Sequence, residues 1–161
     1  IYPYPILKGE IDMKKWIALA CAAGLMSGLS TLSLAAAESG SAAEARAMLD
    51  KTIAAIKADK AAALSQIAKG ENGFKDRDLY PFCGGADGKF TAHPTLTGQS
   101  MKDLKTKDGD PIGSKLYEQA KEGAVAEVGY LWPKPGSSAP AKKVSLVTKI
   151  GDQVCAVGYY Q

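Results

Sequence analysis

The chain has 161 residues, of which 46% are hydrophobic and 23% are charged, and its formal net charge is +3 at pH 7. This length predicts one domain, and the nearly balanced charge gives no reason to expect nucleic acid or an anionic membrane as a partner. The sequence contains no metal-ligand cluster, no phosphate-binding loop and no nucleophile–base pair. We therefore expect no metal site, no cofactor and no enzymatic activity.

Residues 13–37 have the pattern of a secretory signal peptide. A short basic start, Met13–Lys15, precedes an apolar run from Trp16 to Leu34, and Ala35–Ala37 then satisfies the small-x-small rule for cleavage. Retention of this segment as a membrane anchor is the alternative, although glycine, serine and threonine interrupt the apolar run. Export to the bacterial periplasm, or secretion, is therefore expected.

Residues 1–12 precede the first methionine and fit no targeting pattern, so we expect them to be translated leader sequence. The mature chain would begin at Glu38 with a net charge of +2, because three lysines and two acidic residues leave with residues 1–37. It keeps two cysteines, Cys83 and Cys155, and an oxidising compartment favours a disulfide between them. Two buried thiols are the alternative.

Two helices are predicted in the mature chain. Residues 38–44 are expected to be a flexible N-terminus that ends in the capping-box pattern Ser41-Ala42-Ala43-Glu44. Apolar residues at three- and four-residue spacing then predict one long amphipathic helix that ends near Gly70. A second, shorter helix is expected to open at Pro111 and to end near Gly123.

Alternating patterns and turn residues predict five strands, at Leu79–Cys83, Phe90–His93, Val125–Trp132, Lys143–Ile150 and Gln153–Tyr160. Asp87-Gly88 and Gly151-Asp152 mark two tight turns between neighbouring strands. The economical assembly is an α+β fold in which the helices pack on a five-stranded antiparallel sheet.

These residues together resemble a single-Cache domain, an extracytoplasmic relative of the PAS fold found in bacterial chemoreceptors and sensor kinases. The family pattern is an aromatic first strand, Asp-Gly, His-Pro, a Tyr-x-Trp-Pro strand end, a strand-opening lysine and a closing Gly-x-Tyr. Its counterparts here are Tyr80, Asp87-Gly88, His93-Pro94, Tyr130, Trp132, Pro133, Lys143, Gly158 and Tyr160. The resemblance covers residues 45–161 as one Cache domain. It implies a PAS/Cache-like five-stranded antiparallel sheet with a long N-terminal helix on one face and a small-ligand pocket on the other.

The resemblance also implies that the first and last strands are neighbours in the middle of the sheet, which makes a Cys83–Cys155 bridge geometrically feasible. Five residues become candidates for ligand binding: Tyr130, Trp132, Lys143, His93 and Tyr160.

Each candidate has a structural alternative. Tyr130 and Trp132 share one strand face and would supply apolar walls with one O–H and one N–H donor, or they would simply fill the core. Lys143 would bind a carboxylate, or it is an ordinary solvated lysine. His93 would donate to a ligand, or its imidazole would bond carbonyl groups of the following loop.

The function implied by the resemblance is a free-standing periplasmic sensory domain. It would bind a small, carboxylate-like organic metabolite and act with a separate membrane receptor or sensor kinase. The alternative is a structural module without a ligand, in which the N-terminal helix forms a homodimer and Trp132 fills the pocket.

Overall fold

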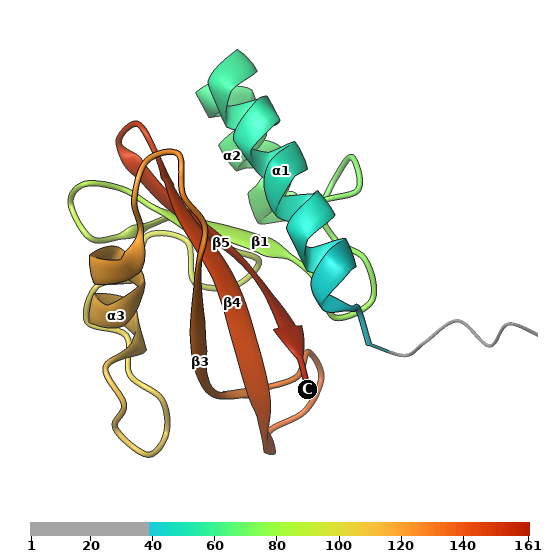
Figure 1. Ribbon diagram of the computed structural model, residues 1–161, viewed down its shortest axis with the longest axis vertical. Coiled ribbons are helices and arrows are strands. Elements are labelled where there is room, and N and C mark those ends of the chain that lie inside the picture. The colour runs from blue at the N-terminus through green and yellow to red at the C-terminus, as the bar shows by residue number, and fades with distance from the viewer. Residues whose placement is uncertain (1–38) are drawn as a thin grey trace, which may run out of the picture. The chain divides into compact units, whose positions relative to one another are not determined.

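The computed structural model describes residues 39–161, and within them three helices and five strands (Figure 1). Their bounds are α1 Ala42–Ala58, α2 Lys60–Lys69, β1 Pro81–Gly84, β2 Phe90–Ala92, α3 Ile112–Gln119, β3 Ala126–Pro133, β4 Pro140–Ile150 and β5 Gln153–Tyr160. The predicted α+β class is confirmed. The expected leader and signal peptide, residues 1–37, lie outside the described residues. Among residues 39–161 no helix combines the length and the apolar character that crossing a membrane requires.

The first helix starts earlier than the expected domain boundary. The side chain of Ser41 accepts a hydrogen bond from the Glu44 amide at 3.3 Å, and the Glu44 carboxylate accepts one from the Ser41 amide at 2.7 Å. This capping box stabilises the helix start by about 1 kcal/mol. The Gly40 amide donates to the buried Asp78 carboxylate at 2.6 Å. Much of the segment 38–44, expected to be flexible, is therefore fixed by hydrogen bonds from Gly40 onward.

The prediction of one continuous N-terminal helix is wrong, because Asp59 divides it into α1 and α2. Asp59 has extended backbone angles, φ −152° and ψ 98°. Its amide closes the last turn of α1 on the Ala55 carbonyl, and its carboxylate caps α2 by accepting from the Ala62 amide at 3.0 Å. The apolar spacing continues across this single residue, so the sequence pattern carries no sign of the break.

The sheet has the strand order β2-β1-β5-β4-β3, and every neighbouring pair is antiparallel. Helices α1 and α2 cover one face, and α3 lies on the other (Figure 1). Because strand side chains alternate between faces, each strand contributes to two cores. On the α1–α2 side Ile56 and Ile67 pack around Cys83 and Ile150, whereas on the α3 side Leu116 packs with the apolar residues Tyr80, Phe82, Phe90, Val128 and Val147.

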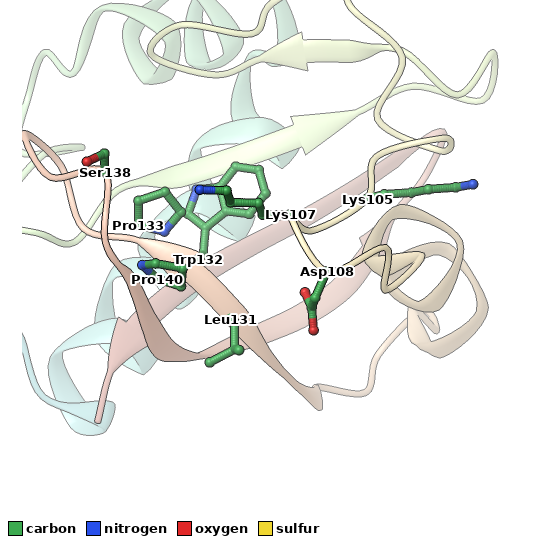
Figure 2. A pocket seen from close by; sticks show the side chains of 8 residues that line it. All are labelled: Lys105, Lys107, Asp108, Leu131, Trp132, Pro133, Ser138 and Pro140. Carbon is green, nitrogen blue, oxygen red and sulfur yellow. The ribbon is translucent and has the colours of Figure 1, made fainter.

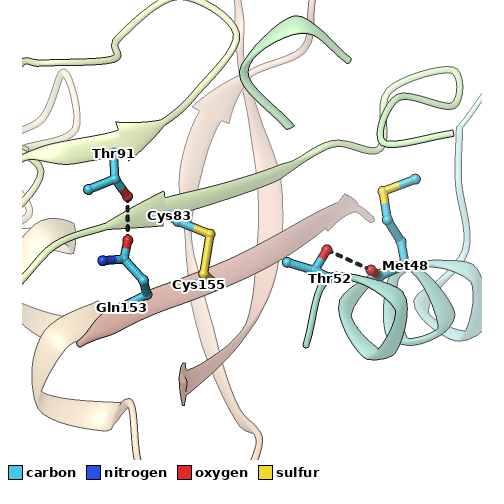
Figure 3. Close-up of a disulfide and its surroundings, with 6 residues drawn as sticks. All are labelled: Met48, Thr52, Cys83, Thr91, Gln153 and Cys155. Atoms are coloured by element: carbon cyan, nitrogen blue, oxygen red, sulfur yellow. Dashed lines mark hydrogen bonds between the residues drawn. A yellow bond between two sulfur atoms is a disulfide. The ribbon is translucent and has the colours of Figure 1, made fainter. Parts of the chain in front are cut away.

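The disulfide predicted between Cys83 and Cys155 is formed (Figure 3). The two cysteines are direct register partners on β1 and β5, the two strands that meet in the middle of the sheet. Both are fully buried on the face that α1 and α2 cover. The bond therefore links the first and last strands of the sheet inside the core.

Strand β4 begins at Pro140 rather than at Lys143, since Pro133 and Pro140 pair at the end of the β3–β4 ladder. Residues 134–139 form the loop between them. This register places Tyr130 opposite Lys143 and Trp132 opposite Ala141. The ends of β3 and β4 thus stand beside the cavity described next.

Candidate functional site

A small enclosed cavity lies between the sheet and α3. Four of the five predicted site residues line it, namely His93, Tyr130, Trp132 and Lys143, together with apolar and aromatic side chains that include Tyr80, Phe82 and Leu116. We call this space the inner cavity. Its volume is about 10 Å³, which is close to the roughly 10–15 Å³ that one water molecule needs. The site is thus nearly closed in this conformation.

Lys143 is the charged group of the inner cavity. It is 2% exposed, and its Nζ donates a hydrogen bond to the Tyr80 hydroxyl at 3.0 Å. The ammonium also lies 4.4 Å from the ring centre of Tyr80 and 5.1 Å from that of Tyr160, positions in which the aromatic faces attract a cation. Burial lowers the pKa of Lys143 to about 7, with Asp78 acting in the opposite direction. None of the carboxylates in residues 39–161 forms an ion pair with it.

Gly158 provides the space that Lys143 occupies. A Cβ atom at Gly158 would lie 2.2 Å from Cε of Lys143 and 2.8 Å from Oγ of Ser145. Ser145 is the register partner of Gly158 on β4, so the long lysine side chain crosses over the glycine toward the cavity. A glycine on β5 therefore allows a lysine on β4 to be buried.

Replacing Gly158 by alanine is expected to push Lys143 out of its position, because the added methyl group overlaps the lysine stem. Overpacking of this kind costs about 1–3 kcal/mol of unfolding free energy, and the pKa of Lys143 should rise toward its ordinary value as the ammonium reaches solvent. Urea unfolding and an NMR titration of the lysine Cε signal measure the two effects. Gly129→Ala on β3 is the matched control, since a Cβ there meets nothing within 4 Å. Equal unfolding free energies and equal pKa values of Lys143 in the two variants would contradict the role of Gly158 in making room for Lys143.

His93 is buried, with 8% of its surface exposed, and serves both the loop and the cavity. Its Nδ1 accepts hydrogen bonds from the amides of Thr95 at 3.0 Å and Leu96 at 3.1 Å, so the ring proton of the neutral form is assigned to Nε2. The loop partners are amides, not the carbonyl groups expected from the sequence. Burial and the charge of Lys143 lower the pKa of His93 to about 4. A neutral histidine with an Nε2–H donor follows at neutral pH.

Tyr130 and Trp132 line the cavity from β3, with their rings 6.3 Å apart in an edge-to-face arrangement. The Tyr130 hydroxyl lies 2.7 Å from Oγ of Ser145, and burial raises the pKa of the tyrosine. Trp132 is half-buried and also borders a pocket of about 380 Å³ on the β3 edge (Figure 2). In that pocket Lys105 points away from the indole ring, and Asp108 adds a negative charge. Trp132 thus borders both the inner cavity and this larger pocket.

Tyr160 does not line the inner cavity but borders Lys143. Its hydroxyl donates to the Pro133 carbonyl at 2.7 Å, which fastens the end of β3 to β5, and burial raises its pKa. Its ring stands beneath the Lys143 ammonium. The structure therefore gives Tyr160 a supporting position, whereas His93, Tyr130, Trp132 and Lys143 come together around one space.

Two residues near the site were not among the sequence candidates. The Tyr80 hydroxyl accepts from Lys143, and burial raises its pKa against the opposing influence of Trp132 and Tyr160. Asp78 is 7% exposed and leaves its Oδ2 without a hydrogen-bond partner. The alternation Tyr80-x-Phe82 is the sequence signal that could have placed Tyr80 on the pocket face. Residues 39–161 contain no group of three histidine, cysteine or acidic side chains that could hold a metal ion.

The fold defines a domain of PAS-like architecture with a cavity between the sheet and α3. Comparison with family models makes the assignment specific: the model described as a Cache domain matches residues 45–159, and the chain belongs to this family. The resemblance seen in the sequence is thereby confirmed. Cache domains are extracytoplasmic, sensory and non-catalytic modules.

Similar proteins come from bacterial chemotaxis. The methyl-accepting chemotaxis protein McpP of Pseudomonas putida is 32% identical over 56 residues, which span 35% of this chain but only 10% of that receptor. A crystal structure of a methyl-accepting chemotaxis protein from Vibrio parahaemolyticus has a TM-score of 0.60 at 25% identity, covering 73% of this chain and 86% of that one. A Cache chemosensory domain described for carboxylic acid recognition has a TM-score of 0.52 at 23% identity, over 73% and 86% of the two chains.

Proposed function

We propose that this chain is a sensory domain that binds a small monocarboxylate in the inner cavity and reports its presence to a separate signalling partner. The observation that carries the proposal is the Lys143 ammonium, 2% exposed and bonded only to a neutral hydroxyl. A buried charge without a counter-charge in direct contact costs several kcal/mol, and the attraction of Asp78 offsets only part of this cost, because the pKa of Lys143 stays lowered. A ligand carboxylate would supply that counter-charge. Binding would then remove the unfavourable free energy of the buried ammonium, and this gain would favour an anionic ligand.

Neutral donors around Lys143 suit the same ligand. The Nε2–H of His93 has no partner within residues 39–161, and the hydroxyls of Tyr80 and Tyr130 face the same space. Phe82 and Leu116 supply apolar walls. An apolar cavity with a few convergent polar groups is the usual form of a small-molecule site, and one buried cation matches one carboxylate.

The volume of the inner cavity limits the size of the ligand. With about 10 Å³ available, even a two-carbon acid must move a wall side chain. Trp132 is the wall residue best suited to move, because it is half-buried and open pockets adjoin its ring. We therefore assign the shortest carboxylic acids as the ligand class.

The comparisons support a sensory role outside the cytoplasm. The chain belongs to the Cache family, and its relatives are sensor regions of chemotaxis receptors. A fold neighbour is described for carboxylic acid recognition, which agrees with the chemistry of Lys143. Export through the signal peptide at 13–37, and action through a membrane receptor or sensor kinase, complete the proposal.

Thermal unfolding in the presence of short acids tests the proposal. Formate, acetate and propionate are expected to raise the melting temperature, and at a concentration 100 times the Kd the gain in unfolding free energy is about 2.7 kcal/mol. Acetamide and ethanol are matched controls of the same size without a charge, and they should have no effect. A chain that responds to none of the acids would contradict the proposal and favour the dimerisation module without a ligand.

A further inference from the structure

A second pocket, about 350 Å³ in volume, lies between the segment after β2 and the loop after β3. It shares Tyr80, His93 and Trp132 with the inner cavity, so these three side chains form a common wall between the two spaces. The opposite side is made by the loop from Pro133 to Ser137. We call this space the loop pocket; its volume falls in the range of ordinary small-molecule sites.

The charges that line the loop pocket are all positive. Lys75 and Lys134 border it, and none of its lining residues is acidic. By contrast, the other two large pockets beside β3, including the one in Figure 2, contain Asp108. An anion would therefore meet only positive charges in the loop pocket, whereas both neighbouring pockets combine lysines with carboxylates.

Lys134 borders the loop pocket, but the two groups that its ammonium contacts, the Ser39 hydroxyl and the Tyr160 ring, are not among the residues that line it. Its side chain is half-buried, its Nζ donates to the Ser39 hydroxyl at 2.8 Å, and it lies 5.5 Å from the ring centre of Tyr160. No carboxylate within residues 39–161 pairs with it. Like Lys143, Lys134 has one neutral hydroxyl as its hydrogen-bond partner and lies beside the Tyr160 ring, but Lys134 is half-buried whereas Lys143 is fully buried.

We propose that the loop pocket is a second carboxylate site, with Lys134 as its cation, and that occupation of this site releases Ser39. The proposal extends the proposed function, because it assigns the same ligand chemistry to a second place. The Ser39 hydroxyl offers the ammonium a hydrogen bond, whereas a carboxylate adds the attraction of a full negative charge. Ser39 does not line the loop pocket, so an ammonium that turns into the pocket to meet the carboxylate leaves the Ser39 hydroxyl.

The release of Ser39 changes how the segment before α1 is held. Ser39 is followed by Gly40, whose amide binds Asp78, and then by the capping box of α1. The Lys134–Ser39 bond joins this start directly to the loop that closes the pocket. Ligand occupancy in the loop pocket thereby changes how the N-terminal segment is held, while the α1 cap remains in place.

An NMR titration of the full-length chain, labelled with 15N, with sodium acetate tests the second site. Two separate sets of shifts are expected, one around Tyr80 and Lys143 and one around Lys134 and Gly136. Lys134→Gln should remove the second set alone, and Lys143→Met the first set alone. Lys149→Gln is the matched control, an exposed lysine on β4 without a side-chain hydrogen bond, and it should keep both sets.

The outcomes separate this inference from the proposed function. If the inner set appears alone and survives Lys134→Gln, the second site is overturned and the inner site stands. If only the shifts around Lys134 and Gly136 appear, the second site is supported and the inner site is overturned. If acetate causes no shifts at all, both sites are overturned. Amide hydrogen exchange at Gly40 tests the release of Ser39. Acetate should accelerate this exchange about tenfold, because the hydrogen bond from the Gly40 amide to the charged Asp78 carboxylate is weakened. Lys134→Gln should accelerate it to the same extent without acetate. Unchanged exchange on acetate addition would overturn the release.

Discussion

Replacing Cys83 and Cys155 together by alanine is expected to lower the free energy of unfolding by about 4 kcal/mol. The disulfide spans a sequence separation of 72 residues, and a cross-link over a loop of that length restricts the unfolded chain by about this amount. It also joins the central strand β5 to its neighbour β1 within the core. Since single domains are stable by only about 5–15 kcal/mol, the double variant should be close to unfolding at physiological temperature.

Urea unfolding at equilibrium measures this effect. Wild-type protein unfolded in the presence of a strong reductant is the matched control, because it lacks the bond but keeps both sulfur atoms. The control and the double variant should lose similar amounts of stability. A loss below about 1 kcal/mol in both would contradict the entropic role of the cross-link.

Replacing Lys143 by methionine is expected to stabilise the protein and to abolish carboxylate binding in the inner cavity. Methionine fills the same volume without a charge, and replacing a buried charged group by an apolar one of similar size often adds about 1–4 kcal/mol. The ammonium is held only by the Tyr80 hydroxyl and aromatic rings, which do not compensate for lost hydration. The gain should be largest at pH 6, where the lysine is charged in both the folded and the unfolded chain.

The lowered pKa of Lys143 determines whether the unfolding free energy of the wild type rises or falls with pH. The pKa of Lys143 is about 7 in the folded protein and 10.5 ordinarily, so between these values the unfolded chain holds a proton that the folded chain lacks. The unfolding free energy of the wild type should then rise with pH, relative to the variant, by up to about 1.4 kcal/mol per pH unit. Acetate binding should weaken above pH 7, because the bound state needs the ammonium.

Chemical unfolding from pH 6 to 10 and acetate titrations over the same range measure both effects. Lys142→Met is the matched control, since Lys142 precedes Lys143 on β4 and is exposed. It should change neither the slope of stability with pH nor the affinity for acetate. A Lys143→Met variant that is less stable at pH 6, or that still binds acetate in the inner cavity, would contradict the role given to this lysine.

The sequence predicted those features that local patterns determine. Period-two alternation placed Tyr130 and Trp132 on one face, and the turn at Gly151-Asp152 set the β4–β5 hairpin. The capping box marked the true start of α1 at Ser41, although the domain boundary was expected later. Asp59 escaped notice because one extended residue interrupts the backbone without disturbing the apolar spacing.

The features that the sequence did not predict depend on contacts between distant residues. The sequence left Lys143 open between a carboxylate-binding lysine and a solvated one, because it follows another lysine, and its burial depends on the missing Cβ of Gly158 in the next strand. Tyr80 becomes part of the site through its bond to Lys143, 63 residues further along the chain. The near closure of the inner cavity is likewise a property of packing between β3, α3 and the sheet. Packing of this kind leaves no periodic trace in the sequence.

The central position of β1 and β5 has a consequence for folding. Because β5 lies between β1 and β4, the two halves of the sheet, β2-β1 and β4-β3, cannot join until residues 153–160 have left the ribosome. Contacts between strands that are distant in sequence slow folding, so closure of the sheet is expected to be a late step. The sheet can close only after the last strand arrives, and the cysteines meet at the same moment.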